Sequence, residues 1–534
     1  MEAIDEEPLE QPEGGERTSA RSLAKAGLVV SGAYLVSRVL GYLRVLLVTT
    51  TFGAGHELDA FNAAFRIPDL IYQLVAAGAV ASALVPMVGG LLATGEDQRA
   101  WRVVSTIANL MLVALAALAA VAFITAPWLV PTFIAPGFPA DILAKTIDLT
   151  RLMLLAPILL ALGAVATSAL NAERRFAATA IAPIVYNLAI IGAALFLSST
   201  MGVTGLAIGV VAGSFGHLAI QLPSLAKAGF RYAPKIDLGD EAARRALILM
   251  LPRVFGLGAS QITIVVMVAL ASSFGSGAVT DWTNAFTLLQ IPLGVIGIPL
   301  GIVLLPSLSR ELAVGRTDVY LALISRSMRI LLFVMLPIAA VGMALSVQVV
   351  DLLLGYGKVD REAVLLTAST LQLFLLGLGA HASIGVLARA FYARHDTRTP
   401  VLAAILAVVI NTSLGWVLVG PIGLPALGLA IAAAAWAEAI VLLVILKRRE
   451  PGLDIAGIAA VAVRSLVASA IAAGVAVVML QLFGGNNGKL FLLVQAAIAT
   501  GVAGLAYVGV SLALRIPELP TMISIVTDLV RRRR

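Results

Sequence analysis

The sequence predicts an all-α polytopic membrane protein of about 14 transmembrane helices, built as two pseudo-symmetric six-helix lobes followed by two C-terminal helices. Three observations support this fold class. Hydrophobic residues make up 60% of the 534 residues and the mean hydropathy is +1.00, which indicates a chain solvated mostly by lipid. Apolar runs long enough to cross a ~30 Å hydrocarbon layer recur along the chain. An internal repeat relates two sets of these runs.

The predicted elements follow one another with short connections. Residues 1–26 are first acidic and then basic, and they are rich in Glu, Pro and Gly, so we expect a disordered cytoplasmic N-terminal tail. Residues 27–228 should form the N-lobe, residues 241–449 the C-lobe, residues 456–515 the two C-terminal helices, and residues 516–534 a basic cytoplasmic tail. The apolar runs begin near Gly27, Asn62, Trp101, Leu143, Phe176, Val203, Ala246, Thr280, Tyr320, Val364, Pro400, Leu424, Gly457 and Leu490.

Every second connection between the predicted helices is basic. Lys and Arg cluster at residues 99–102, 174–175, 227–245, 310–316, 394–398, 447–449 and 531–534, whereas the intervening connections carry few charges. By the positive-inside rule, both termini are therefore expected in the cytoplasm, which requires an even number of crossings. The net charge of +7 reflects this topology, and we expect no binding to nucleic acid.

One motif occurs twice. Phe52-Gly-Ala-Gly-His-Glu-Leu-Asp-Ala-Phe-Asn-Ala63 recurs as Phe274-Gly-Ser-Gly-Ala-Val-Thr-Asp-Trp-Thr-Asn-Ala285, at an offset of 222 residues (274 minus 52). Both copies are predicted on the external side, between the first and second helix of a lobe. Duplicated halves of this kind build the central site of many transporters.

The first apolar run contains two arginines, Arg38 and Arg44. An arginine at the centre of a membrane helix costs roughly 2.5 to 3.5 kcal/mol, so such a side chain usually faces a water-filled cavity or an anion. Gly41 lies between the two arginines on the helix surface and leaves a gap that would suit a bulky anion. The pair therefore predicts a pathway for a negatively charged substrate.

Polar and small residues also form stripes on the first two predicted helices of each lobe. They recur every three or four residues, as expected for one face of a helix. The stripes are Ser31, Tyr34, Arg38 and Gly41; Asp59, Asn62, Arg66, Asp69 and Gln73; Arg253, Gly256, Ser260 and Thr263; and Thr283, Thr287, Gln290, Gly294, Gly297 and Gly301. We interpret these faces as the lining of a central cavity.

Structural alternatives to this interpretation remain open. The glycine stripe could serve close helix packing. Arg66 and Asp69, three residues apart, could form an ion pair, and Arg44 could extend to the external surface. Arg253 lies only about two turns from a basic cytoplasmic pair. Glu438 is also charged at membrane depth, without a same-helix partner that decides its role.

Neither enzyme chemistry nor metal binding is indicated. The chain has no cysteine, no His-Glu-x-x-His and no nucleophile elbow, and Gly484-Gly-Asn-Asn-Gly-Lys-Leu490 lacks the spacing and the Ser/Thr of a P-loop. The four histidines are scattered, so we expect no metal and no cofactor. His217, on an apolar helix, could carry a proton or be structural. Arg464, like Glu438, is charged at depth.

Several short motifs together resemble the MurJ (MviN) family of lipid II flippases. The motifs are Ser37-Arg-Val-Leu-Gly-Tyr-Leu-Arg44, Phe52-Gly-Ala-Gly, Asp59-Ala-Phe61, Phe65-Arg-Ile-Pro68, Ala169-Leu-Asn171, Gln221-Leu-Pro223, Leu304-Leu-Pro-Ser-Leu-Ser309, Tyr356-Gly-Lys358, Phe391-Tyr392 and Thr399-Pro400. The likeness extends from about residue 25 to residue 450, and the last two helices match in position more than in sequence.

This resemblance implies the fold of the multidrug/oligosaccharidyl-lipid/polysaccharide exporter superfamily, in which two six-helix lobes enclose a cationic cavity and two C-terminal helices form a groove for a polyprenyl tail. The implied substrate is lipid II, undecaprenyl-pyrophosphate disaccharide-pentapeptide, moved by alternating access to the outer leaflet of the bacterial plasma membrane for peptidoglycan biosynthesis and cell shape. Partners would be this precursor, membrane lipids and cell-wall synthesis proteins. Arginine forks suit phosphate oxygens.

The resemblance also implies roles for particular residues. Arg38 and Arg44 match two essential arginines of the family, Asp59 matches a family acidic residue, and Ser37 and Gly41 belong to the same motif as the arginines. Four expected charges are absent, because the sequence has Tyr72 or Gln73, Ala77, Phe286 and Thr287 where the family has charged residues. Arg66 and Arg253 could replace the missing cations.

Three other functions remain open. An exporter of another polyprenyl-linked saccharide would explain the altered charges. A cation-coupled drug antiporter would require carboxylates at membrane depth instead of arginines. A scaffold that binds lipid-linked precursors or cell-wall enzymes without transporting them is the third.

Overall fold

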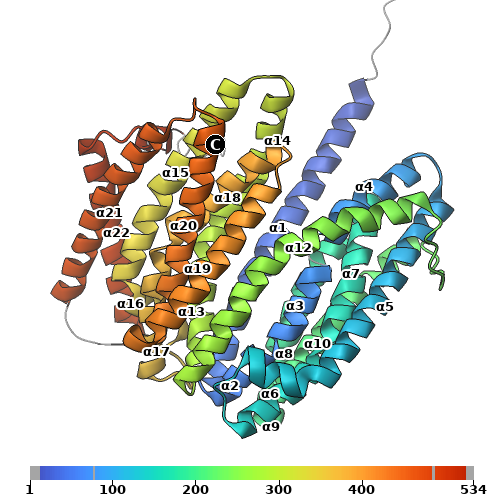
Figure 1. Cartoon of the computed structure of the whole chain (residues 1–534), viewed down its shortest axis with the longest axis horizontal. Helices are drawn as coiled ribbons and strands as arrows, with labels where there is room; N and C mark the ends of the chain where they lie inside the picture. The colour runs from blue at the N-terminus through green and yellow to red at the C-terminus, as the bar shows by residue number, and fades with distance from the viewer. Residues whose placement is uncertain (1–12, 76–78, 484–487, 523, 525–534) are drawn as a thin grey trace, which may run out of the picture.

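The computed structural model describes residues 13–75, 79–483, 488–522 and 524, without the side chains of residues 13–31, 34, 74, 75, 79, 81, 82 and 249–260. Throughout this part of the chain, every regular element is a helix. Figure 1 shows two helical bundles that approach each other at one end and diverge toward the other, with α1 (Glu13–Phe52) between them. The predicted all-α fold class is confirmed.

The number of membrane spans is compatible with the predicted 14. Within the described residues, 11 single helices are long and apolar enough to cross a membrane. The pair α17 (Arg361–Leu375) and α18 (Leu378–Ala393), bent by 45°, meets the same criterion together. The two remaining predicted spans, which begin near Asn62 and Ala246, correspond to α2–α4 and to α12.

We use the name N-lobe for α1 to α11. After α1, its elements are α2 (His56–Ala64), α3 (Arg66–Val75), α4 (Ala79–Ala93), α5 (Asp97–Leu129), the π-helical turn η1 (Val130–Ile134), α6 (Ala140–Met153), α7 (Leu155–Ala172), α8 (Phe176–Phe196), α9 (Ser198–Met201), α10 (Val203–Ala219) and α11 (Leu222–Lys227). Glycines permit the close approach of α8 and α10, since a Cβ at Gly209 would lie 2.4 Å from the Cβ of Ala193.

We use the name C-lobe for α12 to α20. Its elements are α12 (Glu241–Ala271), the 3-10 turn η2 (Ser272–Phe274), α13 (Ala278–Pro292), the π-helical turn η3 (Leu293–Gly297), α14 (Ile298–Ala313), α15 (Thr317–Ala344), α16 (Ser346–Leu354), α17, α18, α19 (Arg398–Ile422) and α20 (Pro425–Arg449). Helix α12 contacts α3 and α4 of the N-lobe as well as α19, so it runs from one lobe to the other.

Two further helices, α21 (Ile455–Phe483) and α22 (Lys489–Ala513), pack against each other and against α15. Arg329 of α15 forms ion pairs with residues at the ends of these two helices. Its Nε lies 2.7 Å from Glu518, which follows α22, and its Nη1 lies 3.2 Å from Asp454, which precedes α21. Ile516 and Leu519 are buried, so the beginning of the predicted C-terminal tail packs on the protein. Residues 525–534 of that tail lie outside the described residues.

The first helix begins earlier than the sequence predicted. Helix α1 starts at Glu13, so residues 13–26 of the predicted disordered tail are helical, and residues 1–12 lie outside the described part of the chain. The apolar stretch of α1 that qualifies as a span is Leu35–Phe52. The preceding residues extend the same helix beyond this span.

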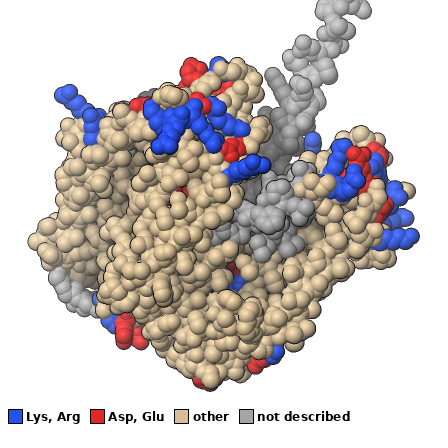
Figure 2. Space-filling model, in the orientation of Figure 1, with Lys and Arg blue, Asp and Glu red and all other residues tan. Residues whose placement is uncertain are grey.

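Charged side chains gather at two opposite edges of the molecule and leave a broad uncharged band between them (Figure 2). On the helices long enough to cross a membrane, large apolar side chains face outward, and Ile124, Phe196 and Trp416 are exposed by 75%, 78% and 75%. Such outward-facing apolar surface is expected where lipid replaces water as the solvent. We call the edge that carries the connections around Arg99 and Arg175 the basic end.

The connection between the lobes is attached along α5. The Nδ2 atom of Asn109 donates to the carbonyl oxygens of Ala233 and Lys235 at 2.8 and 3.0 Å. The backbone N–H of Asp237 donates to Thr106 at 3.3 Å. The connection is therefore part of the N-lobe surface up to the start of α12.

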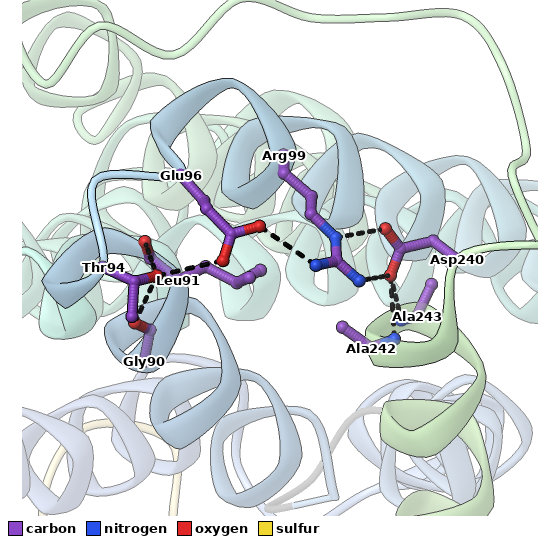
Figure 3. Close-up of polar contacts among 8 residues, drawn as sticks. All are labelled: Gly90, Leu91, Thr94, Glu96, Arg99, Asp240, Ala242 and Ala243. Carbon is purple, nitrogen blue, oxygen red and sulfur yellow. Dashed lines mark hydrogen bonds and ion pairs between the residues drawn. The ribbon is translucent and has the colours of Figure 1, made fainter.

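Asp240 ends this connection and begins α12 (Figure 3). Its Oδ1 accepts the N–H groups of Ala242 and Ala243, which caps the helix. The Nε of Arg99 donates to its Oδ2 at 2.7 Å, while Nη1 of Arg99 donates to Glu96 at 3.0 Å. The hydrogen bond from Arg99 lowers the pKa of Asp240.

Candidate functional site

The two copies of the repeated motif lie against each other at the end where the lobes approach. The carboxylate of Asp59, in the first copy, accepts the N–H of Gly277, the N–H of Thr280 and the hydroxyl of Thr280, each at 2.7 Å. The side chain of Asn62 donates to the same Thr280 hydroxyl at 3.1 Å, and Ser276 accepts the N–H of His56 at 3.0 Å. We call this contact the closed end.

Glycine is required in this contact. The φ of Gly277 is +88°, and a Cβ there would lie 2.7 Å from the carbonyl oxygen of Ala54. Gly357, with φ +60°, brings the connection after α16 against the end of α1, where Lys358 donates its N–H to the carbonyl oxygen of Thr50 at 2.9 Å. Gly277 of the repeat and Gly357 outside it therefore each let two backbones approach closely.

The two equivalent aspartates of the repeat differ in their surroundings. Asp59 is fully buried and bonds across to α13 of the opposite lobe. Asp281, 222 residues later, is also buried, but its Oδ1 accepts the hydroxyl of Thr367 at 2.8 Å, within its own lobe. Asp59 was predicted to bind substrate; its oxygens are engaged by three donors of the C-lobe.

A central cavity of about 210 Å³ lies between the lobes, directly beside the closed end. The N-lobe contributes Arg44, Arg66 and Asp69, and the C-lobe contributes Thr283 and Thr287. The remaining lining is Val45, Val48, Thr49, Leu58, Phe61, Asn62, Phe65, Ile190, Val210 and Asn284. The structure thus brings together the predicted stripes of α2–α3 and α13, together with Arg44.

Arg66 extends across this cavity to the C-lobe. Its Nη2 donates to the hydroxyl of Thr283 at 3.4 Å, and its Nε is buried without a hydrogen-bond partner among the described residues. Asp69, one turn later, instead accepts the side-chain amides of Gln73 at 3.4 Å and Gln261 at 3.2 Å. Within the described part of the chain, Arg66 and Asp69 form no ion pair, so this structural alternative is not realised.

Arg44 lies at the junction of two cavities. Besides the central cavity, it lines a second one of about 320 Å³ inside the N-lobe, which it shares with Phe65 and Asp69. Its guanidinium carbon lies 5.8 Å from the ring centre of Tyr186, a cation–π contact. Arg44 therefore faces the interior and does not extend to the external surface.

Arg38 points in another direction. A Cβ at Gly294 of η3 would lie 2.9 Å from Nη1 of Arg38, which places this guanidinium against the C-lobe. Tyr42, one turn later, donates to the carbonyl oxygen of Gln290 at 3.3 Å. The two arginines thus flank α1 on different sides, and Arg38 contacts the glycine stripe.

Ser37 and Gly41 lie between the two arginines on the surface of α1, where α8 packs against it. Asn187 of α8 donates to the carbonyl oxygen of Ser37 at 3.4 Å. A Cβ at Gly41 would lie 3.9 Å from Oδ1 of the same Asn187. Gly41 therefore faces α8. The space that we expected an anion to fill between the two arginines is occupied by the contact between α1 and α8.

Arg253 and Ala77 cannot be placed in this way. Arg253 belongs to α12, but its side chain lies outside the described residues, and Ala77 lies outside them altogether. Of the other positions where a family charge is absent, Tyr72 lines the second cavity and Thr287 lines the central one. Phe286 stacks on Trp282, with 5.3 Å between ring centres, inside the C-lobe core.

Sequence analysis missed two residues that contact the cavity side chains and one further arginine. Tyr186, which lines the second cavity, and Gln261 gave no charge signal, and only their contacts with Arg44 and Asp69 reveal them. Arg389 of α18 donates to the carbonyl oxygen of Gly385 at 2.6 Å, and a Cβ at Gly301 would lie 2.1 Å from its guanidinium carbon. Arg389 could have been found from the sequence in the same way as Arg38, by searching the apolar helices for charged residues.

Two other charged residues at depth lie apart from these cavities. Arg464 of α21 donates to the carbonyl oxygen of Arg515 at 3.4 Å, and Glu438 of α20 is half-buried in the C-lobe. Among the described residues, no group of three His, Asp or Glu side chains is arranged to hold a metal ion. The central cavity itself presents guanidinium and hydroxyl donors, which suit oxyanions, beside the carboxylate of Asp69.

Comparison with known proteins agrees with this arrangement. The family described as lipid II flippase MurJ matches residues 48–524 of the chain. Lipid II flippase MurJ of Burkholderia cenocepacia is 32% identical over 439 residues, which cover 80% of this chain and 84% of that protein. A probable lipid II flippase MurJ of Rhizobium tropici is 34% identical over 439 residues, which cover 80% and 81%.

Solved structures share the fold. A lipid II flippase MurJ in an inward closed conformation superposes with a TM-score of 0.75 at 21% identity, over 91% of this chain and 99% of that one. An inward-facing multidrug resistance MATE family transporter of the MOP superfamily superposes with a TM-score of 0.63 at 17% identity, over 78% and 95%. The family match covers most of the chain and confirms the resemblance carried by the short motifs: the chain belongs to the lipid II flippase MurJ family.

Proposed function

We propose that this chain is a flippase that moves lipid II from the inner to the outer leaflet of the bacterial plasma membrane by alternating access. The observation that carries the proposal is the convergence of Arg44 and Arg66 with the hydroxyls of Thr283 and Thr287 in one cavity between the lobes. A diphosphate needs several charged donors in a low-dielectric site, and arginine forks match its oxygens. The curated relatives carry this activity in their names.

The direction of transport follows from the charge distribution. Because basic connections mark the cytoplasmic side, the basic end and both termini are assigned to the cytoplasm. The closed end then faces outward, and the lobes diverge toward the inner leaflet, from which a lipid-linked substrate is loaded (Figure 1). Parting of the two repeat copies would open the cavity to the outer leaflet.

The same assignment gives roles to other predicted residues. Arg38, at the glycine stripe of η3, and Arg253 complete the cationic lining of the pathway, and the α21–α22 pair holds the polyprenyl tail outside the lobes. Asp59 closes the external side. Peptidoglycan synthesis proteins and membrane lipids are the partners that this role requires.

A depletion experiment tests the proposal. Cells whose own flippase is depleted are supplied with this chain or with Arg44→Ala, Arg66→Ala or Arg253→Ala, and lipid II exposed on the outer leaflet is measured. The unaltered chain restores exposure and growth, and each cavity variant fails. Arg102→Ala, an exposed arginine of the basic end, is the matched control and supports growth. Restored growth without restored lipid II exposure would contradict the proposal.

A second function, export of another polyprenyl-linked saccharide, is favoured by one observation. Tyr72 and Thr287 line the two cavities at positions where the family resemblance implies charged side chains. In that case the gene is dispensable for growth in its own host, and its loss removes a surface polysaccharide without changing the amount of exposed lipid II. Loss of viability on deletion supports the first function.

A further inference from the structure

The cavity inside the N-lobe is distinct from the central one and is the larger of the two. Its volume is about 320 Å³, against about 210 Å³ for the central cavity. The two share Arg44, Phe65 and Asp69 and therefore adjoin at these side chains. A ligand group next to an anion held by Arg44 would enter this second cavity, which we call the N-lobe pocket.

The walls of the N-lobe pocket are mostly rigid and apolar. Phe65, Tyr72 and Tyr186 contribute aromatic side chains, and Leu160 contributes an aliphatic one. The remaining lining residues are Pro68, Pro157, Pro183, Arg44, Asp69 and His217. Aromatic walls with a few polar groups suit a ring that has an apolar face and a polar edge.

The carboxylate of the N-lobe pocket has unused hydrogen-bonding capacity. Asp69 accepts two long hydrogen bonds, of 3.2 and 3.4 Å, from glutamine side chains. A carboxylate offers about four lone-pair sites, so it can accept more. His217 also lines the pocket, but its Nδ1 is buried against Gly163 of α7. Asp69 is therefore the acceptor for hydroxyl or amide donors of a ligand.

The walls and the balance of charge decide which part of the substrate fits. A diphosphate would gain nothing from the aromatic walls of this pocket, where, among the described residues, Arg44 alone opposes the carboxylate of Asp69, whereas the central cavity also has Arg66. A sugar attached to that diphosphate places hydroxyl donors and an apolar ring face next to the anion. A volume of about 320 Å³ is at the low end of the ~300–1,000 Å³ range of small-molecule pockets, so it holds one ring with a small substituent.

We propose, on the basis of the proposed function above, that the N-lobe pocket binds the first pyranose ring of the lipid-linked glycan while Arg44 holds the adjoining diphosphate. Tyr72 and Tyr186 flank the ring, and Asp69 bonds its polar edge. The rest of the head group stays in the space between the lobes. Tyr72, which together with Gln73 stands where the family resemblance implies one charged residue, then contributes to selection of the sugar.

Binding measurements with two probes test this subsite. The full chain is purified in detergent, and its affinity is measured by native mass spectrometry for undecaprenyl diphosphate, which has no sugar, and for lipid II. We expect the unaltered chain to bind lipid II more tightly. Leu160→Trp, which fills the pocket, should weaken lipid II binding about tenfold and change binding of undecaprenyl diphosphate less than about twofold.

Two control variants test whether the effect of Leu160→Trp is specific to the N-lobe pocket. Leu155→Trp places the same indole on the same helix at an outward-facing position, exposed by 52%, and should change neither affinity. Arg44→Ala should weaken both probes. If Leu160→Trp does not fold, Tyr72→Leu replaces it with the same expected selectivity.

The possible outcomes distinguish the sugar-subsite proposal from the flippase proposal. Equal affinity of the unaltered chain for both probes, or an equal effect of Leu160→Trp on both, overturns the sugar subsite and leaves the flippase proposal standing. Failure of the unaltered chain to bind either probe overturns the flippase proposal itself. Loss of selectivity in Leu160→Trp or Tyr72→Leu, with binding of undecaprenyl diphosphate retained, supports the subsite.

Discussion

The two lobes, although related by the internal repeat, contribute different chemistry to the space between them. The N-lobe supplies two guanidinium groups and a carboxylate to the central cavity, from Arg44, Arg66 and Asp69. The C-lobe supplies neutral groups there, among them the hydroxyls of Thr283 and Thr287. Duplication thus accounts for the architecture that the lobes share. Divergence between them left the charged side chains of the cavity, among the described residues, on the N-lobe.

Because of this difference, the N-lobe can hold an anionic substrate while the C-lobe moves away from it and opens the closed end. Hydrogen bonds between neutral groups contribute roughly 0.5 to 1.5 kcal/mol each, whereas those to charged groups contribute roughly 1.5 to 3 kcal/mol. A C-lobe that contacts the cavity mainly through hydroxyls can move away at modest cost. An anion would then stay on the N-lobe while the closed end parts.

The largest expected effect comes from removing N-lobe charge. Arg44→Ala or Arg66→Ala should lower lipid II exposure in depleted cells by about 10- to 150-fold, because a buried diphosphate would lose a charge-assisted partner. Thr287→Ala, on the opposite wall, should lower it by less than about tenfold. A threonine variant as defective as the arginine variants would show that the charge asymmetry has no functional meaning.

The next effect distinguishes the two aspartates of the repeat. The chain has no cysteine, so Gly55→Cys with Ser276→Cys gives a single cross-link across the closed end, where a Cβ at Gly55 would lie 3.8 Å from the Ser276 hydroxyl. Adding Asp59→Asn should lower the cross-linking rate by about tenfold, because the amide is a weaker acceptor than the carboxylate. Adding Asp281→Asn should leave the rate within about twofold, and equal effects would contradict the asymmetry.

A smaller effect is expected from the equivalent glycines of the two copies. Gly277→Ala should destabilise the closed end by about 1 to 3 kcal/mol, because its φ of +88° and its approach to Ala54 disfavour a side chain. Gly55→Ala should be nearly neutral, since φ there is −159° and the nearest atom is 3.8 Å from the added Cβ. Thermal unfolding in detergent measures both, and a Gly55→Ala defect of equal size would be inconsistent with this account.

The smallest effect concerns the connection between the lobes, which is attached only to the N-lobe through α5 up to Asp240. Arg99 lowers the pKa of Asp240, so the folded-state pKa is depressed. The contribution of this pair is therefore present above the ordinary aspartate pKa of about 3.9 and is lost as pH falls further, through the depressed value.

Because the Arg99–Asp240 pair lies near the surface, its contribution should not exceed about 1 kcal/mol. Protection factors of the 230–240 amides, which are exchange rates corrected for the intrinsic rate at each pH, measure the loss at pH 6 and at pH 3. Arg99→Gln should show at pH 6 part of the fall in protection that the unaltered chain shows only at low pH. Identical protection factors at both pH values would mean that the pair does not hold the connection.

Much of the fold followed from sequence because it depends on patterns along one chain. Apolar length predicts spans, basic connections predict their alternation, and the repeat at residues 52–63 and 274–285 predicts two related lobes. The stripe that contains Arg66 and Asp69 was also placed correctly at the central cavity. The alternative of an ion pair between them is not realised, because Thr283 and Gln261, from the other lobe, contact them instead.

The sequence by itself determined that this is a helical membrane protein with a duplicated motif and interior arginines. Only the tertiary structure decided what each arginine faces. Arg38 and Arg44 are six residues apart, which separates them by about 120° around α1. With that angle, both side chains could face one cavity, or each could face a different neighbouring element. Helical phase fixes direction about one axis, but the bundles packed on each side of α1 decide that Arg38 meets η3 and Arg44 meets the N-lobe pocket.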